Sequence, residues 1–325
     1  MSYPSASPRM FVTPTSRIGH KEYLAEKNLG FNGGFRRLQT FLVAVVTFAL
    51  CQISNLAQAQ GTAPLFWLAG SGPTGPQAHF VLTVSAKVQG RSCKMQLDTG
   101  LNESVRWQEV NPGAEGMARV KVSIAGLSTS IATPRTIARH LRDCGPDAPV
   151  GSLGNALFEH GSLTLDLAKM QLRYQRGSVL AADAAAEPMH YVRWTAQGGH
   201  PLVEIRQDSA LVGDGLLDTG SASFGFAPLS QPQWDRVTSS APLAESKDVR
   251  TFPISSWGRQ HTCFDTAPTA RLQAGHWDLK TSVTYCPELG FNPPQKLEGI
   301  VGLAAFSGAV ITIDYRGERW RATRE

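Results

Sequence analysis

The sequence contains an internal duplication, and a chain that carries one pattern twice must fold in a way that accommodates two copies of one unit. The segment GSLGNALFEHGSLTLDLAKMQLRY, which begins at Gly151, aligns without a gap with GIVGLAAFSGAVITIDYRGERWRA, which begins at Gly299. The offset is 148 residues throughout, and seven aligned pairs are identical, among them Thr164 with Thr312. We therefore expect two similar units, each ending in this segment.

The tetrapeptide Leu-Asp-Thr-Gly occurs once in each half, at residues 97–100 and at residues 217–220. A single copy would ordinarily be a turn, because Asp and Gly are favoured turn formers. At average composition the tetrapeptide is expected at about one position in 50,000, so chance does not explain two copies in duplicated halves. The second half carries 28 additional residues between its aspartate and its glycine segment. We interpret the two tetrapeptides as corresponding functional turns.

The spacing of apolar residues predicts β-strands in both halves. Residues 79–100 alternate apolar and polar side chains around a Gln89-Gly90 turn, which is typical of a hairpin with one buried face. Residues 200–220 repeat this pattern, and another strand pair is expected at residues 118–133. Helical periodicity is limited to short stretches such as residues 135–142. The predicted fold class is all-β.

The chain is expected to consist of two lobes behind a leader. The Ala-rich, strand-poor stretch AADAAAEP opens the expected linker between the lobes. The four predicted parts are an N-terminal extension with signal peptide at residues 1–59, a first lobe at residues 60–180, the linker at residues 181–190 and a second lobe at residues 191–325.

Residues 1–59 have the layout of a secretory signal peptide behind an extension. Two arginines precede an apolar run at residues 41–51, and Ala57-Gln58-Ala59 forms a small-x-small cleavage site. The alternative is an uncleaved membrane anchor through residues 41–58, but its eleven apolar residues are fewer than the roughly 20 that span a bilayer. We expect an exported protein, periplasmic or secreted, with no stable membrane insertion after cleavage.

The formal charge of +5 comes from the leader. Residues 1–59 hold six Lys/Arg and two Asp/Glu, which leaves 25 basic against 24 acidic side chains in the remainder. A body close to neutrality has no electrostatic footprint for phosphate backbones. We therefore expect no nucleic-acid partner.

Four cysteines remain once the leader is removed, and an even number in an oxidising compartment favours disulfides. They are Cys93, Cys144, Cys263 and Cys286. Three pairings are possible; if each half keeps its own bridge, the pairs are Cys93–Cys144 and Cys263–Cys286, and free buried thiols are the alternative. The sequence has no Cys-x-x-Cys and no clustered histidines, so we expect neither a metal nor a cofactor.

These motifs together resemble those of the aspartic protease family, which includes two-lobed pepsin-like enzymes and retropepsins that pair identical subunits. The resemblance rests on the two Leu-Asp-Thr-Gly turns and on two glycine elements, at residues 299–302 and, more loosely, at residues 151–154. It covers about residues 79–325, and each half is nearer in size to a retropepsin subunit. The resemblance implies a bilobal acid-protease-like fold of two homologous β-barrel lobes, with an active-site cleft between them. Two retropepsin-like lobes fused in one chain is a layout of exported bacterial proteins.

By this resemblance Asp98 and Asp218 form the catalytic dyad. Two carboxyl groups at hydrogen-bond distance cannot both ionise cheaply, so the pair holds one proton and titrates as a unit. The ionised member takes a proton from a water while the protonated member donates to the scissile carbonyl. The implied function is that of an aspartic endopeptidase, a monomer whose partner is an extended peptide or protein substrate.

Neighbours of the dyad have supporting roles by the same resemblance. The threonines would hydrogen-bond across the lobes, the glycines after them would let backbone amides approach the carboxylates, and a serine would donate to the second aspartate. These residues are Thr99, Gly100, Thr219, Gly220 and Ser221. The glycines expected to pack beneath the aspartate turns, as architecture, are Gly151, Gly154, Gly299 and Gly302.

The first half departs from the pattern at Leu101, which occupies the place of Ser221 and cannot donate a hydrogen bond. Asp98 therefore lacks one stabiliser of its anion and is expected to be the more easily protonated member of the dyad. The same departure motivates an alternative function, that of a catalytically inactive relative that binds extended peptides or an envelope partner.

Three further expectations concern residues outside the dyad. A hairpin that covers the substrate is expected near Trp107 and the turn at residues 111–113. Asp166 and Asp314, at the ends of the last strands of each half, are expected to be solvated and not catalytic. Serine hydrolysis has no support, because no Gly-x-Ser-x-Gly elbow occurs.

Overall fold

The computed structural model describes residues 60–72, 75–108, 116–145, 148–239, 248–256, 259–288 and 291–324. The chain divides into two units, Met1–Leu56 and Ala57–Glu325, and the described residues all belong to the second. The expected signal peptide, the alternative anchor at residues 41–58 and the turn at residues 111–113 lie outside the described residues. Within the second unit most residues are in strands, which confirms the all-β class.

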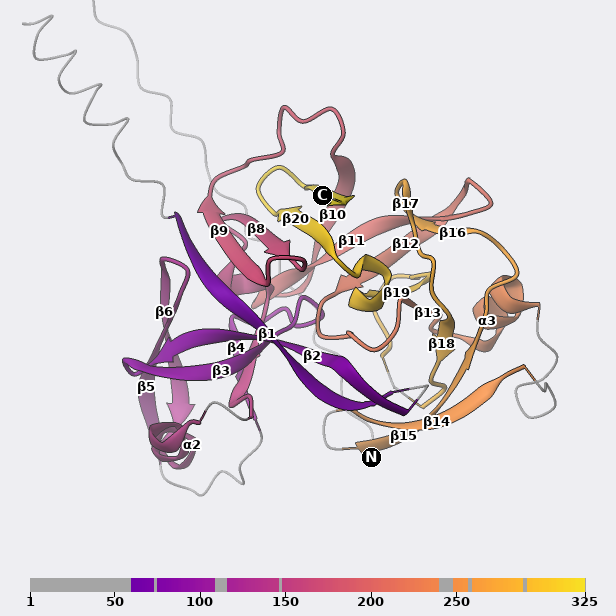
Figure 1. The fold of residues 1–325 in the computed structure, drawn as a ribbon. Helices are drawn as coiled ribbons and strands as arrows, with labels where there is room; N and C mark the ends of the chain where they lie inside the picture. The colour runs from indigo at the N-terminus through magenta and orange to yellow at the C-terminus, as the bar shows by residue number, and fades with distance from the viewer. Residues whose placement is uncertain are drawn as a thin grey trace, which may run out of the picture. The chain divides into compact units, whose positions relative to one another are not determined.

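A six-stranded antiparallel sheet joins the two halves of the duplicated sequence (Figure 1). In order across the sheet its strands are β1 (Gln60–Gly72), β9 (Gln171–Arg176), β8 (Gly161–Asp166), β20 (Ala309–Asp314), β21 (Arg319–Arg324) and β10 (Glu187–Thr195). The duplicated segments meet at its centre, where Thr164 of β8 pairs with Thr312 of β20 and their hydroxyl oxygens lie 3.2 Å apart. Three strands from each half therefore form one sheet.

A second sheet is built from the first half alone. With β1 it contains β2 (Gly75–Val88), β3 (Arg91–Leu97), β4 (Val105–Trp107), β5 (Met117–Ile124), β6 (Leu127–Pro134) and β7 (Gly151–Leu153). The short β7 runs parallel to β3 on one side and antiparallel to β4 on the other. The strand that leads to the first aspartate therefore lies beside the first glycine element.

A third sheet repeats this arrangement in the second half. With β10 it contains β11 (Gly198–Gln207), β12 (Ala210–Asp218), β13 (Phe226–Ala227), β14 (Arg250–Ser256), β15 (Arg259–Thr266), β16 (Leu272–Ala274), β17 (Trp277–Asp278), β18 (Val283–Tyr285) and β19 (Gly299–Gly302). Here β19 runs parallel to β12 and antiparallel to β13. Each aspartate strand thus has a parallel neighbour formed by the glycine element of its own half: β7 beside β3, and β19 beside β12.

Short helices complete the described part of the chain. They are α2 (Arg135–His140), α3 (Gln231–Thr238) and the 3-10 turns η1 (Leu141–Asp143), η2 (Asn155–Leu157) and η3 (Leu303–Phe306). The helical pattern at residues 135–142 is therefore confirmed, as α2 followed by η1. Among the described residues no helix is long and apolar enough to cross a membrane.

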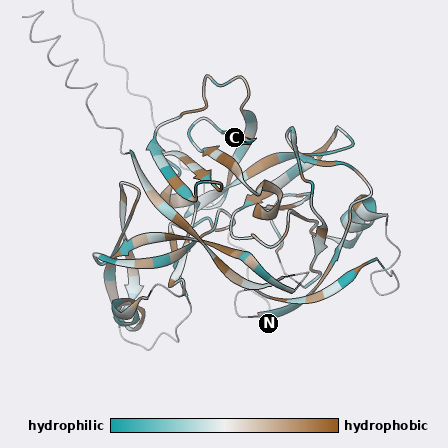
Figure 2. Cartoon of the chain, viewed as in Figure 1, coloured by the Kyte–Doolittle hydropathy of each residue, from teal (hydrophilic) through white to brown (hydrophobic). Residues whose placement is uncertain are grey.

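The alternation of side chains explains why the strands form where they do. In β3, Cys93, Met95 and Leu97 are buried and face the core, while the residues between them are more exposed. Figure 2 shows the same alternation of apolar and polar positions along other strands. The turn into β3 is a two-residue loop in which Gln89 and Gly90 both have positive φ, 51° and 83°. That conformation suits the twist of a tight hairpin, as the sequence predicted.

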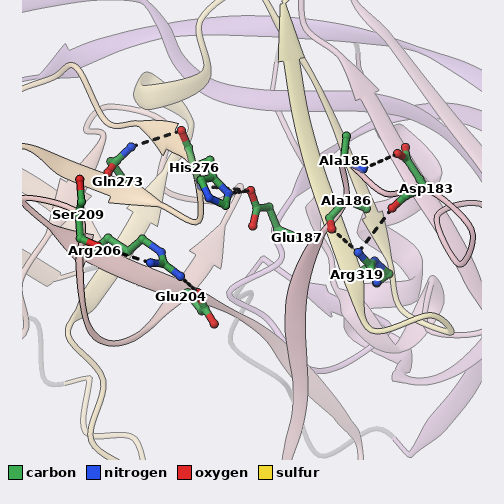
Figure 3. A network of polar contacts seen from close by, with 10 residues as sticks. All are labelled: Asp183, Ala185, Ala186, Glu187, Glu204, Arg206, Ser209, Gln273, His276 and Arg319. Atoms are coloured by element: carbon green, nitrogen blue, oxygen red, sulfur yellow. Dashed lines mark hydrogen bonds and ion pairs between the residues drawn. The ribbon is translucent and has the colours of Figure 1, made fainter.

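Residues 181–190, the expected linker, are partly strand, because β10 begins at Glu187. Polar contacts hold this connection against the second half (Figure 3). The guanidinium of Arg319 donates to the carbonyl of Ala186, and the carboxylate of Glu187 contacts the ring of His276 and accepts a hydrogen bond from its backbone N–H at 3.2 Å.

The expectation that Asp314 is solvated is wrong, because its side chain is fully buried. Its carboxylate accepts hydrogen bonds from the hydroxyl of Ser178 and from the backbone N–H groups of Val179, Leu180 and Gly317, the last three at 2.8–2.9 Å. The chain that leaves β9 folds over the end of β20 at this point. Asp314 therefore compensates its burial with four donors and fastens the first half to the second.

Both disulfides expected from the cysteine count are present. Cys93 is bonded to Cys144 and Cys263 to Cys286, so each half has its own bridge. Disulfides form in oxidising compartments, and the pair therefore fits an exported protein.

We predict that the two disulfides contribute unequally to stability. The Cys93–Cys144 bridge spans 51 residues and the Cys263–Cys286 bridge 23. Loop-closure entropy then gives about 4 and about 3 kcal/mol. Urea unfolding of the two double Cys→Ser variants measures both losses; a larger loss for the shorter bridge would contradict this reasoning.

Candidate active site

The two aspartates lie at corresponding strand ends. Asp98 follows the last residue of β3, and Asp218 is the last residue of β12. Parallel pairing fixes each strand end to a glycine element: the backbone N–H of Asp98 donates to the carbonyl of Leu153 at 3.0 Å, and Asp218 pairs with Gly302. The chain then turns in the same way in both halves, with an N–H to C=O bond from the third residue after each aspartate back to it, at 3.2 and 3.3 Å.

The glycine elements pack beneath the aspartate turns. A Cβ atom on Gly154 would lie 2.4 Å from the carbonyl oxygen of Leu101, and one on Gly302 would lie 2.4 Å from the carbonyl oxygen of Ser221. Only glycine permits contacts this close. The other two glycines are equally confined, since a Cβ on Gly151 or Gly299 would meet neighbouring atoms at 2.4 or 2.5 Å.

Two threonines join the turns by four reciprocal hydrogen bonds. The hydroxyl of Thr99 donates to the carbonyl of Leu217 at 2.6 Å and accepts from the N–H of Thr219 at 2.9 Å. The hydroxyl of Thr219 donates to the carbonyl of Leu97 at 3.0 Å and accepts from the N–H of Thr99 at 3.0 Å. Both threonines are buried. The two turns are therefore held in one fixed relation.

This relation places the two carboxyl groups together between two glycines. A Cβ on Gly100 would lie 2.7 Å from Cγ of Asp218, and a Cβ on Gly220 would lie 2.6 Å from Oδ1 of Asp98. The N–H groups of Gly100 and Gly220 donate to Oδ1 of Asp218 at 3.1 and 2.8 Å. The hydroxyl of Ser221 donates to Oδ2 at 2.6 Å. Asp218 thus accepts three hydrogen bonds besides its contact with Asp98.

Burial raises the pKa of Asp98 well above its ordinary value. The neighbouring charge of Asp218 and the hydrogen bond between the two carboxyl groups raise the pKa further, while Arg106 and the N–H of Gly100 lower it. An upward shift of the Asp98 pKa is what the sequence led us to expect, because Leu101 is buried and offers Asp98 no hydrogen-bond donor. The raised pKa favours the protonated form of Asp98.

A cavity of about 120 Å³ lies in the second half, near the turn that follows Asp218. Its walls include Phe224, Leu229, Phe291 and Ile300. Two of its lining residues lie near Asp218 or its strand partner in the sequence. Phe224 follows Asp218 by six residues, and Ile300 precedes Gly302, which pairs with Asp218, by two.

The first half is polar at the corresponding strand positions. Ile300 of β19 pairs with Leu216 of β12, whereas Ser152 of β7 pairs with Gln96 of β3. The side-chain amide of Gln96 donates to the carbonyl of Gly220 at 3.2 Å and so reaches the other half. The two sides of the dyad share a backbone arrangement and differ in side-chain chemistry.

Trp107 does not project freely from the first half. Its indole N–H donates to the hydroxyl of Thr133 at 2.9 Å, and its ring is half-buried against the core. The turn at residues 111–113, where the covering hairpin was expected, lies outside the described residues.

Sequence reasoning missed Asn155 and Tyr315, which adjoin the first turn. Asn155 is fully buried and its side chain contacts Thr99, Leu101, Gly199 and Tyr315. The available signal was that Asn155 is polar where the duplicated segment has Leu303. Within the described residues no group of three or more His, Cys, Asp or Glu side chains is placed to hold a metal ion.

Comparisons with known proteins add little to this geometry. No family model matches the sequence. No curated protein matches it either. Among solved structures, basic 7S globulin from soybean is similar with a TM-score of 0.40 and 11% identity, covering 82% of this chain and 95% of that chain. A similarity of this size assigns neither a fold nor a function.

We predict that Thr99→Val destabilises the protein by about 2–4 kcal/mol, because it leaves a buried carbonyl and a buried N–H unpaired. Urea unfolding measures the loss. Thr164→Val is the matched control, since its hydroxyl contacts the hydroxyl of Thr312 in the central sheet and a loss below about 1 kcal/mol is expected. Equal losses would show that the bonds between the turns have no special weight.

We predict that the stability of the wild-type protein falls as pH rises above the ordinary aspartate pKa of 3.8. The raised pKa of Asp98 means that the folded state binds more protons than the unfolded state in this window, so the free energy of unfolding decreases with pH until the folded-state pKa is passed. Asp98→Asn removes this titration. Urea unfolding between pH 4 and pH 7 should show a smaller fall for the variant, and identical pH dependence would contradict the assignment.

Proposed function

We propose that this protein is an aspartic endopeptidase with Asp98 and Asp218 as its catalytic dyad. The observation that carries the proposal is the placement of two buried carboxyl groups, from duplicated turns, in direct contact with each other. A turn needs neither burial nor such a partner, and two carboxyl groups that are brought together destabilise the fold. Retaining both in this arrangement is best explained by chemistry that uses them.

We further propose that the chain has the bilobal acid-protease-like architecture, with residues 60–180 and 191–325 as its lobes. Two features support this division. One sheet uses strands of residues 60–153 only, another uses strands of residues 187–302 only, and the central sheet takes three strands from each half. The aspartates sit where the two halves meet, which is where a substrate cleft between lobes would open.

The proposed reaction starts with the proton on Asp98. Asp218 accepts three hydrogen bonds from N–H and O–H donors, and these are contacts that an anion accepts. Asp218 takes a proton from a water while the water oxygen bonds to the scissile carbonyl carbon and Asp98 donates its proton to the carbonyl oxygen. The tetrahedral diol then collapses: one of its hydroxyl groups returns a proton to Asp98, the C–N bond breaks, and the nitrogen receives the proton held by Asp218. An acid and an amine leave, and the dyad ends with one proton.

The proposed substrate is an extended peptide or protein segment in an exported compartment, periplasmic or extracellular, with the enzyme acting as a monomer. The cavity lined by Phe224 and Ile300 could receive one substrate side chain. On the other side of the dyad, the polar residues Ser152 and Gln96 would favour a substrate side chain of different chemistry. We infer that substrates are read asymmetrically about the cleaved bond.

We predict that Asp98→Asn and Asp218→Asn each abolish cleavage of a mixed peptide library by the protein lacking its leader. Each change removes one of the two acid–base partners, and a loss of at least about 100-fold is expected. Mass spectrometry of the digested library measures it. The matched control is Asp166→Asn, an aspartate of the duplicated segment outside the dyad, which should retain wild-type cleavage.

The outcomes separate the two candidate functions. Equal cleavage by wild type and both dyad variants would mean that the dyad is not the catalyst. Binding of library peptides without cleavage, at every pH from 3 to 8, would favour the alternative of an inactive peptide-binding relative, which the buried Leu101 at the place of a serine suggests.

A further inference from the structure

Asn155 uses every polar atom of its side chain at the junction of the two halves. Its Nδ2 group lies 2.6 Å from the carbonyl oxygen of Thr99, 3.1 Å from that of Leu101 and 3.0 Å from that of Gly199. Its Oδ1 accepts a hydrogen bond from the hydroxyl of Tyr315 at 2.9 Å. An NH₂ group has two hydrogens, so three carbonyls share them. The residue is fully buried, which makes each contact costly to lose.

The contacts of Asn155 connect the first aspartate turn to the second half of the chain. Holding the carbonyl of Thr99 fixes the peptide plane that contains the N–H of Gly100, which reaches Asp218, and holding the carbonyl of Leu101 fixes the peptide plane that follows Leu101. Gly199 and Tyr315 belong to the second half. One side chain therefore braces the first turn from beneath and ties it to the opposite half.

The partners of Asn155 are themselves held in place. The ring of Tyr315 packs edge-on against Tyr191 with centroids 5.2 Å apart. The hydroxyl of Tyr191 accepts from the N–H of Gly199 at 2.9 Å and donates to the carboxylate of Glu159 at 3.1 Å. Tyr315 and Gly199, the two second-half partners, are thus linked to each other through Tyr191. This closed set of contacts makes the brace rigid.

Among the described residues the second half has no corresponding brace. The duplicated position of Asn155 is Leu303, and that of Tyr315 is Leu167. The second turn has instead the hydroxyl of Ser221, which donates directly to Asp218. The half with Leu101 has the brace, and the described part of the half with Ser221 has no such brace.

We propose that Asn155 is a positioning residue that compensates for Leu101 by holding the first aspartate turn through its backbone. This inference rests on the proposed function. Asp218 is oriented by a donor to its carboxylate, whereas Asp98, beside an apolar Leu101, is oriented by the peptide groups that follow it. Asn155 touches no reacting atom and acts only through the turn.

The test compares Asn155→Leu, the residue of the duplicated position, with the wild-type protein by two independent readouts. The first is the titration of the Asp98 carboxyl carbon by NMR, assigned by its absence in Asp98→Asn. Asp98 faces Asp218 and Arg106, and a loosened turn separates it from Asp218 and admits water. The pKa of Asp98 should then move down toward its ordinary value. The second readout is peptide cleavage, in which kcat should fall by about 10- to 100-fold with KM little changed.

Two further variants separate positioning from simple loss of stability. Gln233→Leu removes another buried amide, in the second half, whose Nε2 donates to the carbonyl of Leu297 at 2.6 Å, and it should lower stability without moving the Asp98 titration. Tyr315→Phe removes only the donor to Oδ1 of Asn155 and should give a smaller shift in the same direction.

The results that overturn the proposal are specific. An unchanged Asp98 pKa in folded Asn155→Leu, or an equal shift in Gln233→Leu, would show that Asn155 does not position the aspartate. Should Asn155→Leu not fold, Tyr315→Phe carries the same test. If the wild-type protein cleaves nothing, the proposed function fails, while the NMR titration still decides whether Asn155 holds Asp98 beside Asp218.

Discussion

The reciprocal hydrogen bonds between Thr99 and Thr219 are the constraint on which the rest of the site depends. They are buried, they run from each turn to the strand of the other, and they leave the two turns only one relative position. Two carboxyl groups would not stay together without such a frame, because burial and mutual repulsion both oppose it. Gly100 and Gly220 serve the same end, since a Cβ on either of them would collide with the aspartate of the opposite turn.

Each half of the duplicated sequence contributes one turn to this frame, and the two turns differ in the residues that surround their aspartates. Ser221 donates to Asp218, while the corresponding Leu101 packs its side chain over Gly154. The first half regains an orienting contact through Asn155, which acts on the backbone rather than on the carboxylate. A backbone brace fixes the turn without adding a donor to the anion, so it leaves Asp98 with its raised pKa. Restoring a serine at this position would remove that difference.

Features set by neighbouring residues were predictable from the sequence, and features set by distant ones were not. The Gln89-Gly90 turn follows from the local need for positive φ, and the strands follow from side-chain alternation. The disulfides follow from counting cysteines within each half. The burial of Asp314 and the contacts of Asn155 depend on segments more than 40 residues away, which no local pattern encodes. The duplication exposed the aspartates because it made one long-range relation visible in the sequence.

The two halves of the chain differ in sequence, and this difference removes a symmetry that two identical halves would have. With identical turns, the shared proton has two equivalent positions, and a substrate can bind in either direction with the same result. Here three donors contact Asp218, whereas Leu101 stands beside Asp98 at the position that corresponds to Ser221. The state with the proton on Asp98 and the state with the proton on Asp218 therefore differ in free energy. The strands behind them differ too, apolar at Leu216 and Ile300 and polar at Gln96 and Ser152. If the protein is the proposed endopeptidase, the protonated Asp98 and the different side chains of these strands together favour one direction of substrate binding.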